Sequence, residues 1–361
     1  MLAVASVASL SALAGCAAEP VFDRGAVASP LSTTENLKVI AERAGLSEAV
    51  MTALVPGDQP GCSAAVGVEG TVVWAGAAGL ADLSTGSPVT TETRFDFASI
   101  SKQFTATAIL MLQREGLLSV SDPVGAYVDG MPAWANTVTL DQLIHHTARI
   151  PDYWVELDEV GIGFSDAADQ ATTLAAIARE TRLEPGEGFY YSNSHYVLLA
   201  EVVARVSGQT LPDFLVTRIF EPLELDMVVA PTSQGPDIAV SYDANLNPQP
   251  LGWSSYGHSG IISTPSEFVR WGDQYRAGDI IQDDFEAGAV YEGEGELYAA
   301  GMDIEVDGDL NHTGRMGGYV SDFTVSADRD TVVAVACNGH ASNRFGIAES
   351  LWMIWEPHSK E

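Results

Sequence analysis

Hydrophobic and polar positions repeat with two different periods in the first third of the chain. Over residues 33–54, apolar positions recur at the spacing of one helix face. Residues 61–82 instead form two β-like runs separated by Glu69-Gly70, which predicts a β-hairpin. A second helical pattern runs from about Ser99 to residue 116. The pattern therefore predicts a helix, a hairpin and a second helix, in that order.

The remaining chain changes period twice more. Residues 118–294 alternate short helical segments with Pro- and Gly-rich turns, such as Glu184-Pro185-Gly186. Strand patterns return at 297–306, 310–314, 323–327 and 331–337, and residues 344–355 predict a final helix. We therefore predict an α+β protein in which 32–117 and 295–361 form a sheet domain and 118–294 form an inserted helical domain.

The amino terminus reads as an export segment. Residues 1–16 are small and apolar and end in Leu13-Ala14-Gly15-Cys16, which resembles a bacterial lipoprotein box, although no basic residue precedes it. Either Cys16 is lipidated in a periplasmic or cell-envelope lipoprotein, or an ordinary signal peptide is cleaved and the protein is secreted. Residues 17–31 form a tether. Both interpretations predict export, with membrane contact only through a lipid on Cys16.

Charge and composition narrow the classes of partner. The formal net charge is −32, with 49 acidic residues against 17 Lys and Arg. No basic stripe is present that would neutralise phosphates, so we expect no nucleic-acid partner. Because 46% of the residues are hydrophobic, the chain can form a packed core, and the acids serve solubility or suit a salty habitat. The histidines show no metal-ligand spacing, so we expect no metal and no cofactor.

The distribution of lysine points to one position. The chain has three lysines, Lys38, Lys102 and Lys360, and Lys102 lies three residues after Ser99. Side chains at this spacing on a helix lie about 5–6 Å apart, so the amine can reach the hydroxyl. An apolar site lowers the pKa of a lysine enough for it to take a proton from the serine. A solvated lysine beside a helix-capping serine is the alternative.

Two further short motifs follow in the sequence, Tyr191-Ser192-Asn193 and His312-Thr313-Gly314. Taken alone, Tyr191 is equally consistent with an aromatic cluster, and His312 with a packed histidine. Together with S-x-x-K at 99–102, they resemble the three active-site motifs of the serine β-lactamase and penicillin-binding protein family. The resemblance is to the branch of class C β-lactamases, serine D-Ala-D-Ala carboxypeptidases and related esterases, and it covers about residues 35–357.

The resemblance implies a fold and a set of roles. The fold is an antiparallel β-sheet flanked by the terminal helices, with a helical insertion domain. Ser99 would be acylated, while Lys102 and Tyr191 would share the removal of its proton. For the phenol of Tyr191 to act as a base, cationic neighbours must lower its pKa, and Lys102 and His312 are the candidates.

The same resemblance implies the substrate contacts. Asn193 would bind Lys102 and the substrate amide, and the backbone N–H groups of Ser99 and Arg315 would hold the oxyanion. Gly314 would let the substrate approach the strand closely. Thr313 would hold a substrate carboxylate.

Some features depart from related hydrolases. The segment LIHHTARIPDYW has Ala148-Arg149 where the family commonly has Ser-Gly. A bulky cation thus replaces a glycine beside the expected cleft, which changes the substrate preference expected there. No G-x-S-x-G elbow is present, which argues against an α/β-hydrolase. The deacylating glutamate of class A β-lactamases has no counterpart, so water activation would fall to Tyr191 and its neighbours.

Two cysteines follow Cys16, and the resemblance predicts how they lie. Cys62 opens the first predicted strand and Cys337 closes the last, and in the family these strands are antiparallel neighbours. The Cα atoms of directly opposed residues in such strands lie about 4.5–5.5 Å apart, which is compatible with a disulfide in an oxidising compartment. Two buried thiols are the alternative.

The motifs leave several functions open. Class C β-lactamases usually carry lysine at the position of His312, and a mostly neutral histidine attracts a substrate carboxylate less. Thr313 and either Arg344 or Arg149 would then hold that carboxylate locally. We therefore expect a D-Ala-D-Ala carboxypeptidase or peptidase with slow β-lactam turnover, acting on a small-molecule or peptide substrate. An esterase or amidase, a dedicated β-lactamase and a catalytically silent binding protein are the alternatives.

Overall fold

The computed structural model describes residues 34–235 and 237–356. They divide into a short unit, 34–40, and a unit that begins at Ala41, and the following description concerns the second. The predicted signal segment and tether, 1–31, lie outside the described residues. Of the described helices, none combines the length and the apolar character that crossing a membrane requires.

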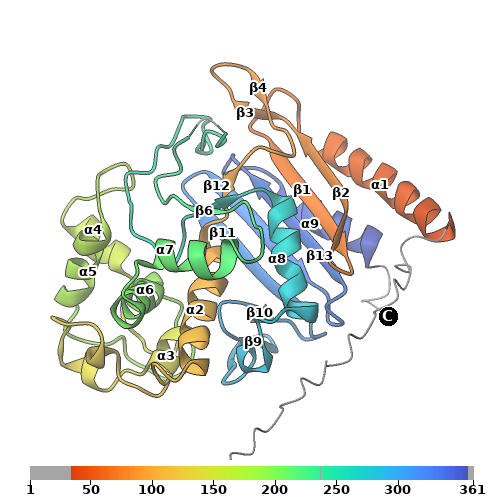
Figure 1. Ribbon diagram of the computed structural model, residues 1–361. Helices are drawn as coiled ribbons and strands as arrows, with labels where there is room; N and C mark the ends of the chain where they lie inside the picture. The colour runs from red at the N-terminus through yellow and green to blue at the C-terminus, as the bar shows by residue number, and fades with distance from the viewer. Residues whose placement is uncertain (1–33, 236, 357–361) are drawn as a thin grey trace, which may run out of the picture. The chain divides into compact units, whose positions relative to one another are not determined.

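The centre of the fold is an eight-stranded sheet with the order β2-β1-β13-β12-β11-β10-β9-β8, antiparallel throughout (Figure 1). The order places strands from the two ends of the chain side by side, which confirms the predicted fold class. The strands are β1 Cys62–Val68, β2 Thr71–Ala78, β8 Val290–Gly293, β9 Glu296–Tyr298, β10 Asp303–Ile304, β11 Leu310–Met316, β12 Tyr319–Val325 and β13 Thr331–Cys337.

The predicted strand at 297–306 is two strands, β9 and β10, which pair with each other. Gly301 separates them with φ of +83°, a left-handed conformation that favours glycine. A Cβ at Gly301 would lie 2.6 Å from the backbone nitrogen of Gln103. The close approach of this turn to the segment after Lys102 therefore breaks the run.

Cys62 and Cys337 lie directly opposite each other on β1 and β13 and form a disulfide, with Cα atoms 4.0 Å apart. The predicted bond is thus confirmed. It joins the first strand of the sheet to the last strand in the sequence.

Helices cover both faces of the sheet, because every residue of β13 is buried and successive side chains point to opposite faces. Helices α8 and α9 both pack on β1 and β13. The helices are α1 Thr34–Leu54, α2 Lys102–Arg114, α3 Leu140–Ile144, α4 Tyr153–Glu159, α5 Gln170–Arg179, α6 Asn193–Ser207, α7 Leu211–Leu215, α8 Pro265–Ala277 and α9 Arg344–Trp355. Helix α8 and strand β8 belong to the range predicted to be helical, 118–294, yet both contribute to the sheet and its cover.

The helical part of the fold is built around α2 and α6, which pack against each other. Helix α6 buries Tyr196 through Ala200 together with Val202 and Val203, and it ends at Gly208 with φ of +72°. Helix α2 buries every residue from Lys102 to Leu110. A lysine side chain therefore begins a helix whose first nine residues are all buried.

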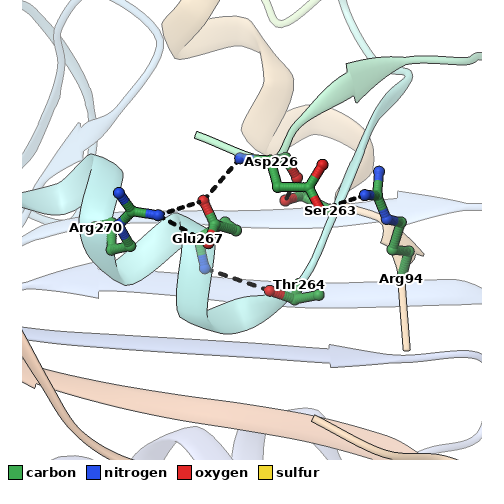
Figure 2. A network of polar contacts seen from close by, with 6 residues as sticks. All are labelled: Arg94, Asp226, Ser263, Thr264, Glu267 and Arg270. Atoms are coloured by element: carbon green, nitrogen blue, oxygen red, sulfur yellow. Dashed lines mark hydrogen bonds and ion pairs between the residues drawn. The ribbon is translucent and has the colours of Figure 1, made fainter. Parts of the chain in front are cut away.

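A second, three-stranded sheet has the order β5-β7-β6, and its strands are β5 Phe95–Asp96, β6 Val228–Val229 and β7 Ile261–Ser263. Figure 2 shows the polar network beside it. The N–H of Asp226 donates to Glu267 Oε2 at 2.9 Å, its carbonyl accepts from Ser263 Oγ at 2.9 Å, and its carboxylate forms an ion pair with Arg94. Because Arg94 directly precedes β5, the network anchors the segment that leads to Ser99.

Candidate active site

Ser99 lies in a single 3₁₀ turn, Ala98–Ser101, so the α-helix expected from Ser99 begins at Lys102. Ala98 has φ of +50°, a left-handed conformation that costs a non-glycine residue about 1–2 kcal/mol. Its N–H donates to Oδ1 of the buried Asp96 at 2.7 Å, which stabilises the turn. The serine is therefore held on a strained turn at the start of a buried helix.

The amine of Lys102 is fully buried and donates three hydrogen bonds. They go to Ser99 Oγ at 3.1 Å, to Asn193 Oδ1 at 2.9 Å and to the carbonyl oxygen of His258 at 3.2 Å. Burial lowers the pKa of Lys102 to about 7, while the negative charge of Asp152 acts in the opposite direction. Near neutral pH this amine is therefore able to accept a proton.

Asp152 fixes the orientation of Asn193. Its Oδ2 accepts from the backbone N–H of Asn193 at 2.9 Å and from Nδ2 at 2.8 Å. Because Nδ2 is committed to this carboxylate, the amide oxygen faces the amine of Lys102. Burial raises the pKa of Asp152, and its hydrogen bonds and Lys102 oppose that rise. The sequence prediction did not include Asp152, although the quoted segment LIHHTARIPDYW contains it.

Tyr191 lies beside Lys102, whose Nζ is 4.7 Å from the centre of the phenol ring. The residue is 37% exposed, but protein atoms surround its hydroxyl, and this burial raises the pKa of Tyr191 above its ordinary value. A hydrogen bond with Ser99 partly opposes the rise. The expectation that cationic neighbours lower this pKa is therefore wrong, and the phenol keeps its proton at neutral pH.

His312 on β11 is buried and neutral. Burial and the nearby charge of Lys102 lower its pKa to about 3. Its Nδ1 donates to the carbonyl of Thr313 at 2.7 Å, and its ring centre lies 6.4 Å from that of Tyr191. A neutral imidazole at this position cannot supply the permanent positive charge of a lysine.

Gly314 is required for packing inside the protein. A Cβ at this position would lie 2.2 Å from Ser321 Oγ and 2.3 Å from the carbonyl oxygen of Phe97. The missing side chain thus makes room for the segment that carries Ser99. This contact by itself requires a glycine, and the close approach of a substrate stays a prediction.

The backbone N–H and C=O groups of Arg315 face the side of β11 that has no neighbouring strand at this position. The two-residue turn Gly317-Gly318 pairs Met316 with Tyr319, and β10 pairs with β11 only as far as Asn311. Backbone groups alternate in direction along an antiparallel strand, so those of Arg315 point away from β12. Strand β11 also packs on the turn that holds Ser99. An oxyanion between the N–H groups of Ser99 and Arg315 is consistent with this arrangement.

The structure brings together Ser99, Lys102, Tyr191, Asn193 and His312, which the sequence placed in three separate motifs. Thr313 and Arg315 lie on the other face of β11, with their side chains partly or largely exposed. The signal that would have found Asp152 was its place after a proline in a segment that otherwise matches the family.

Ser101 and Arg149 have structural partners. Ser101 Oγ accepts the N–H of Ile261 at 3.1 Å, which links the turn to β7. Arg149 donates through Nε to the carbonyl of Glu184 at 3.0 Å and through a second nitrogen to the carbonyl of Pro185 at 2.5 Å. The cation that replaces the family's glycine therefore holds the loop that precedes Tyr191.

Carboxylates of Glu305, Asp307 and Asp309 come within 4.8 Å of one another around the turn between β10 and β11. Elsewhere, Nδ1 of His146 and Nδ1 of His195 lie 2.8 Å apart, which is one hydrogen bond between two buried imidazoles. The absence of a metal stays a prediction.

Comparison with known proteins identifies the family. Residues 48–352 match the Beta-lactamase family model. A penicillin-binding protein of Bacillus subtilis (strain 168) is 30% identical over 191 residues, covering 52% of this chain and 40% of its own. A D-aminopeptidase of Brucella anthropi is 35% identical over 168 residues, covering 45% of this chain and 31% of its own. The chain thus spans less than half the length of these two relatives.

Solved structures share the fold. The octameric penicillin-binding protein homologue from Pyrococcus abyssi has a TM-score of 0.70 and 25% identity, over 88% of this chain and 74% of that one. A D-stereospecific amidohydrolase from Streptomyces sp. has a TM-score of 0.72 and 22% identity, over 86% and 98%. Because the family model spans most of the chain, the protein belongs to the β-lactamase family.

Proposed function

We propose that the protein is an exported peptidase of the D-Ala-D-Ala carboxypeptidase type, which forms an acyl-enzyme on Ser99 and turns β-lactams over slowly. The observation that carries the proposal is the buried amine of Lys102, 3.1 Å from Ser99 Oγ and with a pKa of about 7. A serine hydroxyl needs a base near it, and a base is most effective when its pKa lies near the working pH.

Acylation follows from the positions of the three groups. Ser99 Oγ bonds to the substrate carbonyl carbon as its proton moves to Lys102 Nζ. The carbonyl oxygen becomes an oxyanion facing the N–H groups of Ser99 and Arg315. The C–N bond then breaks as the hydroxyl of Tyr191 gives its proton to the leaving amine. Tyrosinate recovers a proton from the Lys102 ammonium, so both groups return to their starting states.

Deacylation uses the same groups in the same order. Water adds to the acyl carbon and gives a proton to Lys102, through Tyr191 where the phenol lies between them. The bond to Ser99 Oγ then breaks, the serine regains a proton from the same pair, and a carboxylic acid leaves. The raised pKa of Tyr191 suits a proton donor and relay, so Lys102 acts as the base.

The substrate class follows from charge and from the relatives. Neutral His312 and a net charge of −32 give weak attraction for the carboxylate of a β-lactam. The D-aminopeptidase relative and the D-stereospecific amidohydrolase of the same fold support a substrate with a D-amino-acid residue. Slow turnover of penicillin is consistent with both observations.

Export is part of the proposal. The Cys62–Cys337 disulfide suits an oxidising compartment, and the tetrad ending in Cys16 suits a lipoprotein of the periplasm or cell envelope. Metabolic labelling with a fatty-acid analogue, compared between the natural chain and Cys16→Ser, tests the lipid. Labelling that persists in Cys16→Ser would contradict a lipid at this position.

The activity is tested by comparing three substrates, an N-acylated D-Ala-D-Ala peptide, p-nitrophenyl acetate and benzylpenicillin. We expect release of D-Ala, and a penicillin adduct that persists on the protein in intact-mass spectra. Penicillin turnover near about 10²–10³ per second would instead identify a dedicated β-lactamase. Hydrolysis of the ester without release of D-Ala would identify an esterase.

A further inference from the structure

A cavity of about 430 Å³ lies beside the carboxyl end of β11. Its volume is in the range of small-molecule sites, about 300–1,000 Å³. The walls include the rings of Trp154 and Phe164, the side chains of Arg315 and His340, and Gly317. Trp154 directly follows the Asp152-Tyr153 pair, and Arg315 directly follows Gly314. Two residues of the cavity wall are therefore next in sequence to residues of the proposed active site.

The positive charge of Arg315 is not neutralised by the protein. Its guanidinium donates to His340 Nε2 at 3.0 Å, and because a guanidinium can only donate, that ring nitrogen carries no proton. Across 34–235 and 237–356, no carboxylate lies within ion-pair distance of Arg315. The side chain is exposed toward the cavity and solvent.

One carboxylate, that of Asp243, also lines the cavity, but its own loop occupies it. Asp243 Oδ1 accepts from the backbone N–H groups of Asn245 at 2.8 Å and Asn247 at 2.9 Å, and Oδ2 accepts from Asn247 Nδ2 at 3.1 Å. These bonds lower the pKa of Asp243. They hold the carboxylate on its own loop, and it forms no ion pair with Arg315.

The two arginines that the sequence suggested for holding a carboxylate do not line this cavity. Arg149 binds the carbonyls of Glu184 and Pro185. The charge of Arg344 opposes the rise in the pKa of the buried Asp322. Arg315 is thus the arginine whose side chain lines the cavity.

The direction of β11 assigns the cavity to the acyl side of a substrate. Tyr191 and His312 lie together, and in the proposed mechanism Tyr191 protonates the leaving group. Residues 315–317 lie three to five positions farther along the strand, about 10–17 Å away at about 3.3 Å per residue. A substrate bound across the oxyanion position therefore directs its acyl group toward the cavity.

We propose that this cavity is an acyl-group subsite that takes an apolar, preferably aromatic, group carrying a carboxylate. Trp154 and Phe164 would contact the ring, and the guanidinium of Arg315 would bind the carboxylate. A free ammonium at the same place is disfavoured, which separates this substrate class from that of an aminopeptidase. The inference rests on the proposed acyl-enzyme mechanism.

The test uses p-nitrophenyl esters of three phenylacetic acids that differ at the para position. One carries a carboxylate, the second a carboxamide of the same shape, and the third an aminomethyl group. We expect the natural chain to prefer the carboxylate over the carboxamide by about fivefold or more in kcat/KM, and to disfavour the ammonium. The preference should reside mainly in KM and decline with added salt.

Arg315→Gln should reduce the ratio of carboxylate to carboxamide to about one, and Arg315→Lys should keep part of it. Because the two esters are compared within each variant, a general loss of activity does not change the ratio. Arg205→Gln, which removes an exposed arginine on α6, is the charge-matched control and should keep the ratio of the natural chain.

A ratio at or below one in the natural chain, or an unchanged ratio in Arg315→Gln, overturns the subsite. If both esters acylate Ser99 without such a preference, the subsite is wrong and the mechanism stands. If neither ester is hydrolysed and Ser99 is not acylated, the mechanism fails, and the subsite fails with it.

Discussion

Replacing Arg149 by glycine is expected to slow the reaction while leaving the protein folded. Arg149 has φ of +57°, so glycine relieves about 1–2 kcal/mol of backbone strain. The variant loses hydrogen bonds to the carbonyls of Glu184 and Pro185, at about 0.5–1.5 kcal/mol each, and the contact of the guanidinium 5.0 Å over Tyr190, at about 0.5–1 kcal/mol. The net cost is about 1–2 kcal/mol, a small part of typical stabilities of about 5–15 kcal/mol.

The catalytic effect should be larger than the effect on stability. The loop held by Arg149 leads directly to Tyr191, and a displacement of about 1 Å costs up to about a hundredfold in rate. We therefore expect kcat for p-nitrophenyl acetate to fall about tenfold to a hundredfold in Arg149→Gly. Trypsin should also cut faster after the exposed Arg182, which lies in the same loop.

Two variants serve as controls for this experiment. Arg149→Lys keeps the charge but lacks the fork that reaches both carbonyls, so its rate should fall between those of the natural chain and Arg149→Gly. Arg182→Gln, added to Arg149→Gly, should remove the faster tryptic cut and leave kcat at the value of Arg149→Gly. If Arg149→Gly keeps its kcat within about twofold and its resistance to trypsin, Arg149 does not position Tyr191.

Three further predictions concern the base, its support and the disulfide. Acylation should rise between about pH 6 and pH 8, because Lys102, with a pKa of about 7, accepts a proton only when neutral, and a rate constant flat from about pH 5 to pH 10 would refute this. Asp152→Asn should move the midpoint of that profile to lower pH, because the carboxylate raises the pKa of Lys102. It should also lower the plateau rate, because Asn193 loses an anionic hydrogen-bond acceptor. An unchanged midpoint would exclude the coupling between Asp152 and Lys102. Reduction of Cys62–Cys337 should lower the free energy of unfolding by about 2–4 kcal/mol in chemical denaturation, and identical transitions with and without reductant would show that the bond does not stabilise the protein.

Local periodicity predicted those parts of the fold and site that depend on neighbours in the sequence. Ser99 and Lys102 lie three residues apart, so a helical turn is enough to bring hydroxyl and amine together. The hairpin around Glu69-Gly70 follows in the same way from two short strands and a turn. The pairing of Cys62 with Cys337, 275 residues apart, came from the family resemblance and not from periodicity.

Contacts between distant segments could not be predicted from the sequence pattern. Asp152 has a local role that its position indicates, since Oδ1 accepts the N–H of Trp154 and caps α4. Its second role, orienting Asn193, depends on how α4 and α6 lie in the folded chain. Arg149 is similar: the sequence shows a bulky cation near the cleft, while its direction toward the carbonyls of the 184–185 loop is a property of the tertiary structure.

Tyr191 shows why residue type alone did not give its ionisation state. Cationic neighbours lower the pKa of a phenol and burial raises it, and the balance depends on how many protein atoms surround the hydroxyl. The sequence supplied the neighbours, Lys102 and His312. It did not supply the burial that keeps His312 neutral and Tyr191 protonated.

The central claim is acylation of Ser99, and mass spectrometry after brief exposure to benzylpenicillin tests it most directly. Trypsin cuts after Arg94 and Lys102, so residues 95–102 form one peptide, and fragmentation distinguishes Ser99 from Ser101. We predict one adduct on Ser99, its loss in Ser99→Ala and its retention in Ser101→Ala. An adduct on Ser101, or an adduct that survives in Ser99→Ala, would contradict the proposed nucleophile.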